Sequence, residues 1–309
     1  MSDLKPSSPR LAALAVAVLL GAAAFALGRM FGPRGQAAAG CLFFIAVAAV
    51  FSSNLRRVNW RTVAAGVGLQ LLLALFILKF EVAGVRPGYA FFGAVADFVK
   101  RFLEFTNAGS QFVFGGLADQ SVMSKVFEGG MVFAFTALPP IIFVSSFFTV
   151  LYYLGVLQLV VGLMARLMVR LMGTSGAESL SAAANVFMGQ TEAPIIVKPY
   201  IPGMTQSEML AMMIGGMATI SGGVMAVYIA LGADPIAILT TSVMAAPAGL
   251  YLSKILIPEM EEPLTRGEVR MAVERTHANA IDAAASGASD GMVLAINVAA
   301  MLIAFLAFI

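Results

Sequence analysis

The sequence predicts an all-α, polytopic membrane protein. The first observation is composition: 60% of the 309 residues are hydrophobic and only 12% are charged, whereas a soluble domain carries about 25% charged residues. The second is a series of charge-free runs long enough to cross a bilayer as helices. The third is a polar hexapeptide between two apolar stretches, each too short to cross. The net charge of +2 and the scattered basic residues argue against a nucleic-acid partner.

The predicted spans follow from run length, because a bilayer core about 30 Å thick takes roughly 20 apolar residues as a helix. The run at 129–165 is much longer than one span and contains Pro139-Pro140. The first run follows a basic flank, as in a signal peptide, but no small-x-small cleavage site follows it, which favours an uncleaved first helix. The runs are residues 11–28, 35–55, 62–78, 129–165, 209–233, 235–253 and 291–309.

Arginines in short connections set the expected orientation. The connection between the second and third spans holds three arginines, so the positive-inside rule places it in the cytoplasm. The mixed segment 82–127 then lies on the outer face. The stretch 160–172 lies on the cytoplasmic side, where we expect an amphipathic interfacial helix that is basic on one face. The arginines are Arg56, Arg57 and Arg61 in the connection, and Arg166 and Arg170 in the helix.

Residues 179–200 fit no simple span. Two apolar halves flank the polar tip at 189–194, and each half is too short to cross the membrane. Gly189 permits a break in helical geometry, and Pro194 suits the first turn of a new helix. The pattern predicts a re-entrant hairpin of two half-helices hinged at these two residues. The alternative is a wetted interfacial loop, which the apolar and symmetric flanks disfavour.

A helix break at membrane depth indicates a binding site. Unpaired backbone groups cost several kcal/mol in hydrocarbon, so breaks occur where protein or a water-filled cavity satisfies them. The ends of half-helices then bind ligands and cations. Gln190, Thr191 and Glu192 supply a donor, a hydroxyl and a carboxylate that can read the hydrogen-bonding edge of a flat polar ring.

Asn185 lies about one helical turn before the break. Both interhelical hydrogen bonding and a cation-ligand role remain open for it. In the next helix, Gly222-Gly223 follows Thr219 and Ser221, a pattern that predicts local unwinding. Unwinding there would free the carbonyls of Thr219 and Ile220, which suit a hard cation such as Na⁺.

These motifs resemble the concentrative nucleoside transporter family, in its bacterial sodium-coupled branch. The similarity runs from about residue 37 to the end of the chain. The matching motifs are Gly-Gln-Thr-Glu-Ala-Pro at 189–194, Leu-Tyr-Tyr-Leu-Gly-Val at 151–156, Met-Ala-Ala-Pro at 244–247 and Asn-Ala-Ile-Asp-Ala-Ala at 279–284.

The resemblance implies a sodium-coupled nucleoside symporter of the bacterial inner membrane, without an organic cofactor. It implies a homotrimer in which a transport domain moves against a scaffold like an elevator. Nucleobase contacts then fall on Gln190, Thr191 and Glu192, and the pair Gly189-Gln190 is similar to members that accept uridine and purine nucleosides. The sodium ligands are then Asn185, Met188, Thr219 and Ile220, with Met188 and Ile220 acting through their carbonyls.

The resemblance also divides the chain, which matches the first half of an inverted-repeat transporter. Residues 1–127 are N-terminal transmembrane helices and an outer-face linker; 128–178 are scaffold; 179–257 are the hairpin and two helices of the transport domain. Residues 258–290 are expected to be a solvated cytoplasmic loop, and 291–309 the start of the next helix. A second hairpin and two further helices, which carry the ribose-binding groups in the family, are expected beyond Ile309.

Three other functions are compatible with parts of the sequence. A proton-coupled transporter would use the same fold with Glu192 as the proton site. An intramembrane enzyme built on Glu192 and Thr191 lacks a base, because the only histidine, His277, lies in a charged segment. A purely structural membrane subunit is the remaining alternative.

Overall fold

The computed structural model describes residues 8–126, 132–190, 193–268 and 277–309. Within these ranges the chain is helical, with isolated β-bridges but no β-strand. Seven helical stretches of the described chain are long and apolar enough to cross a membrane, which confirms the predicted fold class. They are Leu11–Met30, Gly32–Val50, Trp60–Leu78, Phe133–Tyr153, Gln206–Ile229, Pro235–Leu256 and Ala280–Phe308.

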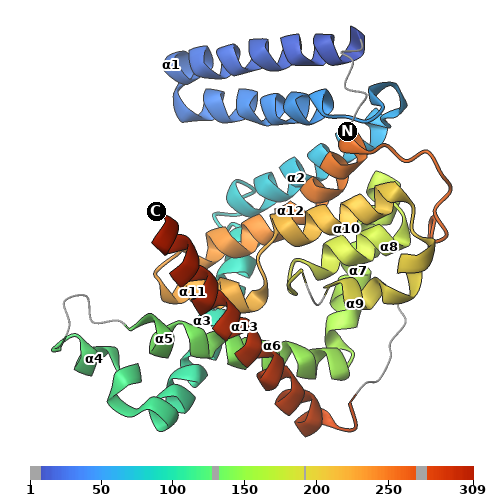
Figure 1. Cartoon of the computed structure of the whole chain (residues 1–309). Helices are drawn as coiled ribbons and strands as arrows, with labels where there is room; N and C mark the ends of the chain where they lie inside the picture. Colours follow the sequence, from blue (N-terminus) through green and yellow to red (C-terminus); the bar gives the residue numbers. More distant parts are fainter. Residues whose placement is uncertain (1–7, 127–131, 191–192, 269–276) are drawn as a thin grey trace.

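Helix α1 (Ser8–Val50) is a pair of helices joined at a sharp turn. Gly32 takes a φ of 69°, which glycine adopts without steric cost, and Pro33 follows it. The two arms run back along each other at one edge of the molecule (Figure 1). The predicted run 11–28 falls on the first arm, and the run 35–55 extends past the end of the second arm at Val50.

Helix α2 (Trp60–Leu78) begins at Asn59, whose side chain accepts hydrogen bonds from the Arg61 and Thr62 N–H groups. The segment expected as a mixed outer-face linker instead contains a long amphipathic helix, α3 (Pro87–Phe114). Its first turn packs closely on the end of α2, since a Cβ on Gly88 would lie 2.9 Å from the Ile77 Cα. The short helices η2 (Gly115–Ala118) and α4 (Gln120–Met123) follow.

The run at 129–165 divides into α5 (Phe133–Thr136), α6 (Leu138–Tyr153) and the first part of α7 (Val156–Met172). Pro139 and Pro140 lie in the first turn of α6, where a missing N–H costs little. Gly155, with a φ of 81°, turns the chain from α6 into α7.

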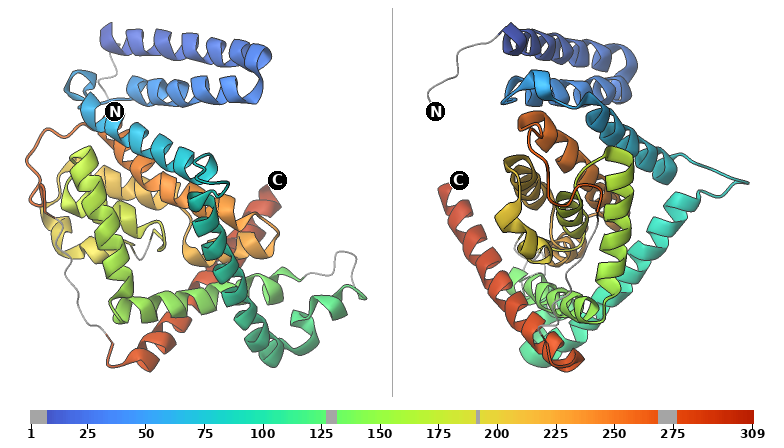
Figure 2. Two further views of the ribbon diagram at one scale, coloured as in Figure 1. Left: turned by 180° about the vertical axis from the view of Figure 1, so that it is seen from behind. Right: turned by 90° about the vertical axis from the view of Figure 1, so that its right-hand side faces the viewer.

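Helix α7 is amphipathic as expected, but it begins before residue 160 and its exposed face is not purely basic. Its buried face packs against neighbouring helices, and a Cβ on Gly66 of α2 would lie 2.8 Å from the Met172 Cε. Thus α7 ends beside the start of α2, whereas α3 begins beside the end of α2. Figure 2 shows α7 and α3 running steeply across the direction of α2.

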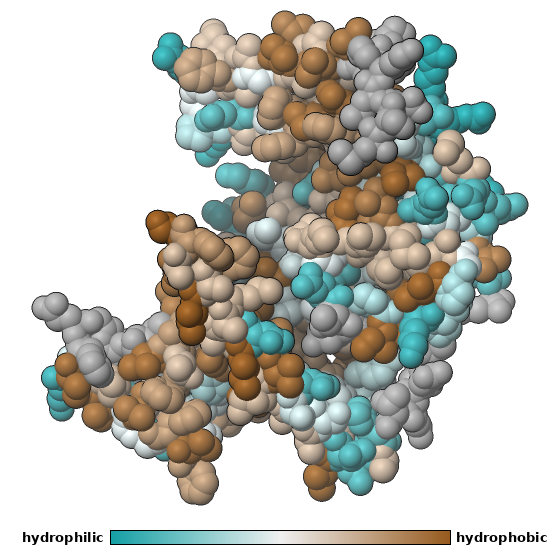
Figure 3. Space-filling view, viewed as in Figure 1, coloured by the Kyte–Doolittle hydropathy of each residue, from teal (hydrophilic) through white to brown (hydrophobic). Residues whose placement is uncertain are grey.

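One predicted boundary in the last third of the chain was wrong. Helix α13 (Ala280–Phe308) begins inside the segment expected as a loop, because Asn279 caps it by accepting from the Asp282 N–H. It packs along α6 through glycines: a Cβ on Gly291 would lie 2.7 Å from the Ile142 Cα. Large hydrophobic side chains remain exposed on α13 and α1, as the brown surface in Figure 3 shows, which suits contact with lipid.

We expect Gly291→Ala to destabilise the protein. The added methyl group would overlap the α6 backbone, and overpacking of this kind costs about 1–3 kcal/mol. Gly68→Ala is the matched control, because a Cβ at Gly68 meets nothing within 4 Å and alanine favours a helix. Thermal unfolding in detergent should show a lower Tm for Gly291→Ala alone. Equal Tm values for both variants would contradict the packing of α13 on α6.

Candidate functional site

The predicted hairpin consists of α8 (Gly176–Ala184), α9 (Ala193–Val197) and the 3₁₀ helix η3 (Lys198–Gly203). It starts before residue 179 because Ser175 and Glu178 form a capping box at the start of α8. A second capping box, of Thr205 and Glu208, starts α10 (Gln206–Ala218) directly after η3. The Ser175 hydroxyl donates to Glu208 over 2.5 Å, so the chain leaves the hairpin beside the point where it begins.

The tip of the hairpin leaves helical geometry earlier than the sequence indicated, directly before Asn185. Helix α8 ends at Ala184, and Gly189 lies in the non-helical segment that follows. The Gly189 carbonyl accepts a hydrogen bond of 3.0 Å from the Ala193 N–H, at the start of α9. Pro194 is the second residue of α9, so its missing N–H leaves no bond unmade.

The predicted unwinding is also present. Helix α10 ends at Ala218, and α11 (Gly222–Ala230) begins after three residues outside the helices. Thr219 is extended, with φ −120° and ψ 158°. No N–H among the described residues donates to the carbonyls of Thr219 and Ile220.

The hairpin tip packs directly on this break. The Gly222 N–H donates to the Phe187 carbonyl over 3.0 Å, which joins the two non-helical segments. Gly215 faces the Asn185 amide, since an added Cβ would lie 3.0 Å from its Nδ2. Gly216 likewise faces Gln190, with 3.0 Å from an added Cβ to the Gln190 Cβ. The glycines of α10 and α11 therefore allow the close approach of the hairpin.

Asn185 is the most informative residue of the tip. Its side chain is buried, and its Nδ2 donates to the Ser181 carbonyl over 2.9 Å. Its Oδ1 is also buried but has no hydrogen-bond partner within the described chain. A buried acceptor without a partner costs about 1–3 kcal/mol, so this oxygen is suited to a ligand.

The four residues predicted to bind a cation lie on these two facing segments. Asn185 and Met188 belong to the hairpin tip, and Thr219 and Ile220 belong to the break between α10 and α11. The candidate ligand atoms are an amide oxygen and backbone carbonyl oxygens, which fit a hard cation such as Na⁺. Thr219 keeps its hydroxyl occupied, donating to the Gly215 carbonyl over 2.8 Å.

The predicted substrate contacts are described only in part. Gln190 is exposed at the tip, whereas Thr191 and Glu192 lie outside the described residues. A cavity of about 410 Å³ opens beside Thr219 and Ile220, between the broken helix and α12 (Pro235–Leu256). Polar groups that the sequence did not single out line it: Tyr228, Thr241 and Ser242.

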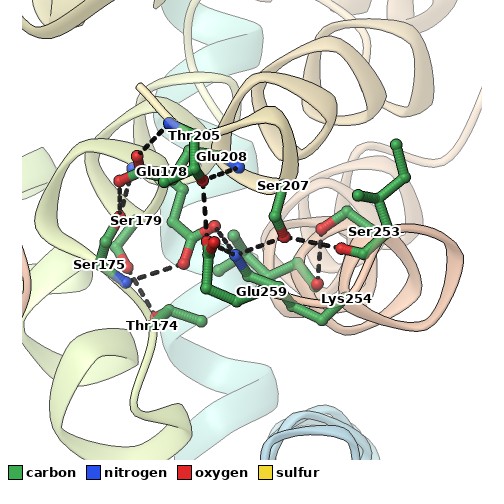
Figure 4. Close-up of polar contacts among 12 residues, drawn as sticks. Thr174, Ser175, Glu178, Ser179, Thr205, Ser207, Glu208, Ser253, Lys254 and Glu259 are labelled. Carbon is green, nitrogen blue, oxygen red and sulfur yellow. Dashed lines mark hydrogen bonds and ion pairs between the residues drawn. The ribbon is translucent and has the colours of Figure 1, made fainter. Parts of the chain in front are cut away.

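A buried ionic network holds the base of the hairpin (Figure 4). Lys254, near the end of α12, lies 2.7 Å from Glu178 of α8 and 3.1 Å from Glu259. Its ammonium also donates hydrogen bonds to the Ser207 hydroxyl of α10 over 2.9 Å and to Glu259. Thr205 completes the network by donating to Glu259 over 2.9 Å. One lysine thus links three helices at the end of the hairpin remote from its tip.

Most of the described residues between α12 and residue 268 are exposed, as the sequence predicted, but Thr265 is buried against the start of α8. Thr265 accepts from the Gly176 N–H through its carbonyl and from the Ala177 N–H through its hydroxyl, each over 2.9 Å. The first N–H groups of a helix have no intrahelical acceptor, and this segment supplies them for α8. The two S/T-x-x-E capping boxes were the available sequence signal for these buried glutamates.

We expect Lys254→Met to lower stability severely. Removing the lysine leaves Glu178 buried without a counter-charge, which costs about 3–5 kcal/mol. The double variant Lys254→Met with Glu178→Gln should recover much of the loss, because Glu178 is the more deeply buried of the two glutamates that Lys254 pairs with and it then carries no charge. Arg266→Gln is the control, because its pair with Glu262 is exposed. Thermal unfolding in detergent checks this, and a Lys254→Met protein as stable as Arg266→Gln would refute the role of the network.

Models of known protein families match most of the chain. Residues 39–117 match the model described as Na⁺ dependent nucleoside transporter N-terminus. Residues 134–235 match nucleoside recognition, and residues 237–309 match Na⁺ dependent nucleoside transporter C-terminus. The chain belongs to the concentrative nucleoside transporter family. The members of this family are transporters and not enzymes.

Relatives in this family include bacterial and mammalian proteins. The chain is 44% identical over 270 residues to an uncharacterized transporter of Haemophilus influenzae, and 42% identical over 270 residues to sodium/nucleoside cotransporter 1 of Mus musculus. Both alignments cover 87% of this chain. They cover 62% of the H. influenzae protein and 39% of the mouse protein, so the chain spans only part of the length of these relatives.

Solved structures support the same relationship. The chain is similar to CNTnw in an inward-facing substrate-bound state, with a TM-score of 0.81 and 41% identity, over 87% of this chain and 64% of that one. A CNTnw variant in an outward-facing state gives a TM-score of 0.80 and 38% identity, over 98% of this chain and 66% of that one. The near-equal scores assign the chain to neither state.

Proposed function

We propose that the protein works as a sodium-coupled nucleoside symporter in the bacterial inner membrane. The observation that carries this proposal is the buried, unpartnered Oδ1 of Asn185 at the junction of two broken helices. Family membership supports the transport of nucleosides, and the family description as Na⁺ dependent supports the ion. The ion would be a co-transported substrate, and its gradient would drive nucleoside uptake.

The chain's own residues would couple ion and substrate through one structure. Asn185 and the carbonyls of Met188, Thr219 and Ile220 would surround Na⁺ with oxygen atoms. Binding would satisfy oxygens on both segments, so it would hold the hairpin tip against the break. Gln190 lies at that tip beside Gly216. Ordering of the tip would therefore also fix the position in which Gln190 contacts a nucleobase.

The complete site would need more than this hairpin. Gln190, Thr191 and Glu192 would read the base of a uridine-like or purine nucleoside. The ribose contacts would come from a second hairpin. In this proposal the hairpin, α10, α11 and α12 move together in the bilayer against a scaffold that includes α6 and α13, within a homotrimer. Lys254 supports this grouping, because it ties α8, α10 and α12 to one another.

Asn185→Ala should raise the sodium concentration that half-saturates uptake by about tenfold or more, because a hydrogen-bond-like contact to a charged group contributes about 1.5–3 kcal/mol. Asn185→Asp keeps an oxygen at the same position and should retain sodium dependence. The measurement is uptake of labelled uridine by the intact protein across a sodium series. An unchanged half-saturating concentration in Asn185→Ala would rule out this ion site.

Glu192→Gln should weaken uridine uptake and raise its KM, because the carboxylate is replaced by an amide that donates as well as accepts. Uptake in proteoliposomes, with sodium or with choline in the buffer, checks this. It also distinguishes sodium coupling from proton coupling. If uptake persists without sodium and follows the pH gradient, the protein is proton-coupled and Glu192 is the candidate proton site. Unchanged uptake and KM in Glu192→Gln would remove this residue from the substrate site.

A further inference from the structure

Two arginines on α7 have no partner among the residues that the structure describes. Arg166 and Arg170 lie one helical turn apart, and both are exposed. Neither forms an ion pair or a side-chain hydrogen bond with any residue in the described part of the chain. By contrast, the exposed Arg86 and Arg266 each pair with a glutamate. The two α7 guanidinium groups are therefore free to bind an anion.

These arginines lie on an otherwise apolar face. Successive turns of the exposed side of α7 carry leucines at a spacing of four residues, so leucines and arginines share one face of the helix. Between 48% and 71% of each leucine is exposed. The leucines are Leu159, Leu163, Leu167 and Leu171. A soluble anion would gain nothing from this apolar surface, whereas a molecule with an acidic head and hydrocarbon chains would contact both parts.

The position of α7 in the fold places the pair at a membrane surface. Its last residue packs on the start of α2, and α7 runs steeply across the direction of that span (Figure 2). The chain just before and at the start of α2 carries three further arginines, so the basic residues gather at one end of the span. The positive-inside rule makes this the cytoplasmic end. These arginines are Arg56, Arg57 and Arg61.

There is room for a headgroup beside the pair. A cavity of about 360 Å³ is lined by Arg166, Val169, Arg170 and Gly267. Gly267 has a φ of 73°, a conformation that glycine adopts readily, at the edge of this space. Two guanidinium groups one turn apart offer several N–H donors, a geometry that suits phosphate oxygens better than a single ammonium does.

We propose that Arg166 and Arg170 bind the phosphate of an anionic phospholipid from the cytoplasmic leaflet, with its acyl chains against the leucines of α7. The site is separate from the hairpin tip and does not depend on the proposed transport function. Because α7 packs against α8, a bound lipid would stabilise the helix that begins the hairpin.

The experiment compares phosphatidylglycerol with phosphatidylcholine on the intact protein. Each lipid is titrated into delipidated protein in neutral detergent, and native mass spectrometry measures the bound fraction. Wild-type protein should retain phosphatidylglycerol preferentially. Arg166→Gln with Arg170→Gln should weaken that binding by about thirtyfold, since each basic residue near an anionic headgroup contributes about 1 kcal/mol. Arg166→Lys with Arg170→Lys keeps the charge and should retain part of the preference.

The matched control is Arg86→Gln with Arg266→Gln, which removes the same charge from two paired arginines. It should leave phosphatidylglycerol binding within about twofold of wild type, since paired exposed arginines contribute little. Thermal unfolding in the lipid-free detergent should show that both double variants remain folded. The proposal is overturned by equal retention of both lipids in wild type, or by equal losses in the two double variants. Displacement of the lipid by inorganic phosphate at matched ionic strength would also overturn it, since the site would then be a simple anion site.

Discussion

The central constraint on this fold is that backbone N–H and C=O groups need partners inside a membrane protein. The chain interrupts a helix twice near its centre, once after α8 and once between α10 and α11. The two interruptions meet, and the bond from the Gly222 N–H to the Phe187 carbonyl satisfies one group from each. The buried Asn185 Oδ1, which has no partner in the described chain, lies at the same junction. The proposed cation site lies where the two breaks meet.

Contacts at the base of the hairpin hold the two breaks in position. Two capping boxes start α8 and α10 side by side, and Lys254 fastens both to α12. Because this network is buried at the base of the hairpin, it fixes the helices while the tip remains accessible. The segment around Thr265 supplies acceptors to the start of α8. The polar groups at the base thus stabilise the hairpin, and those at the tip are left for ligands.

Local chemistry explains which features were predictable from sequence. The breaks at Gly189 and before Gly222 were located because glycine, proline and short polar side chains mark them within apolar runs. Helix α3 and the first turns of α13 were missed because their mixed composition resembles a linker until a tertiary partner is known. The Lys254 network joins residues far apart in sequence, so only the capping boxes pointed to it. The burial of Asn185 was not predictable from sequence, because it depends on the packing of α10 against the hairpin.

Hydrogen exchange of the intact protein, measured by mass spectrometry in sodium and in choline at equal ionic strength, tests the junction most directly. Residues 185–190 and 218–223 should both exchange more slowly in sodium, because one ion would bind oxygens on both segments. Asn185→Ala should abolish the slowing in both segments together. Exchange that is the same in sodium and choline, or that slows in only one segment, would contradict a shared ion site at the meeting of the two broken helices.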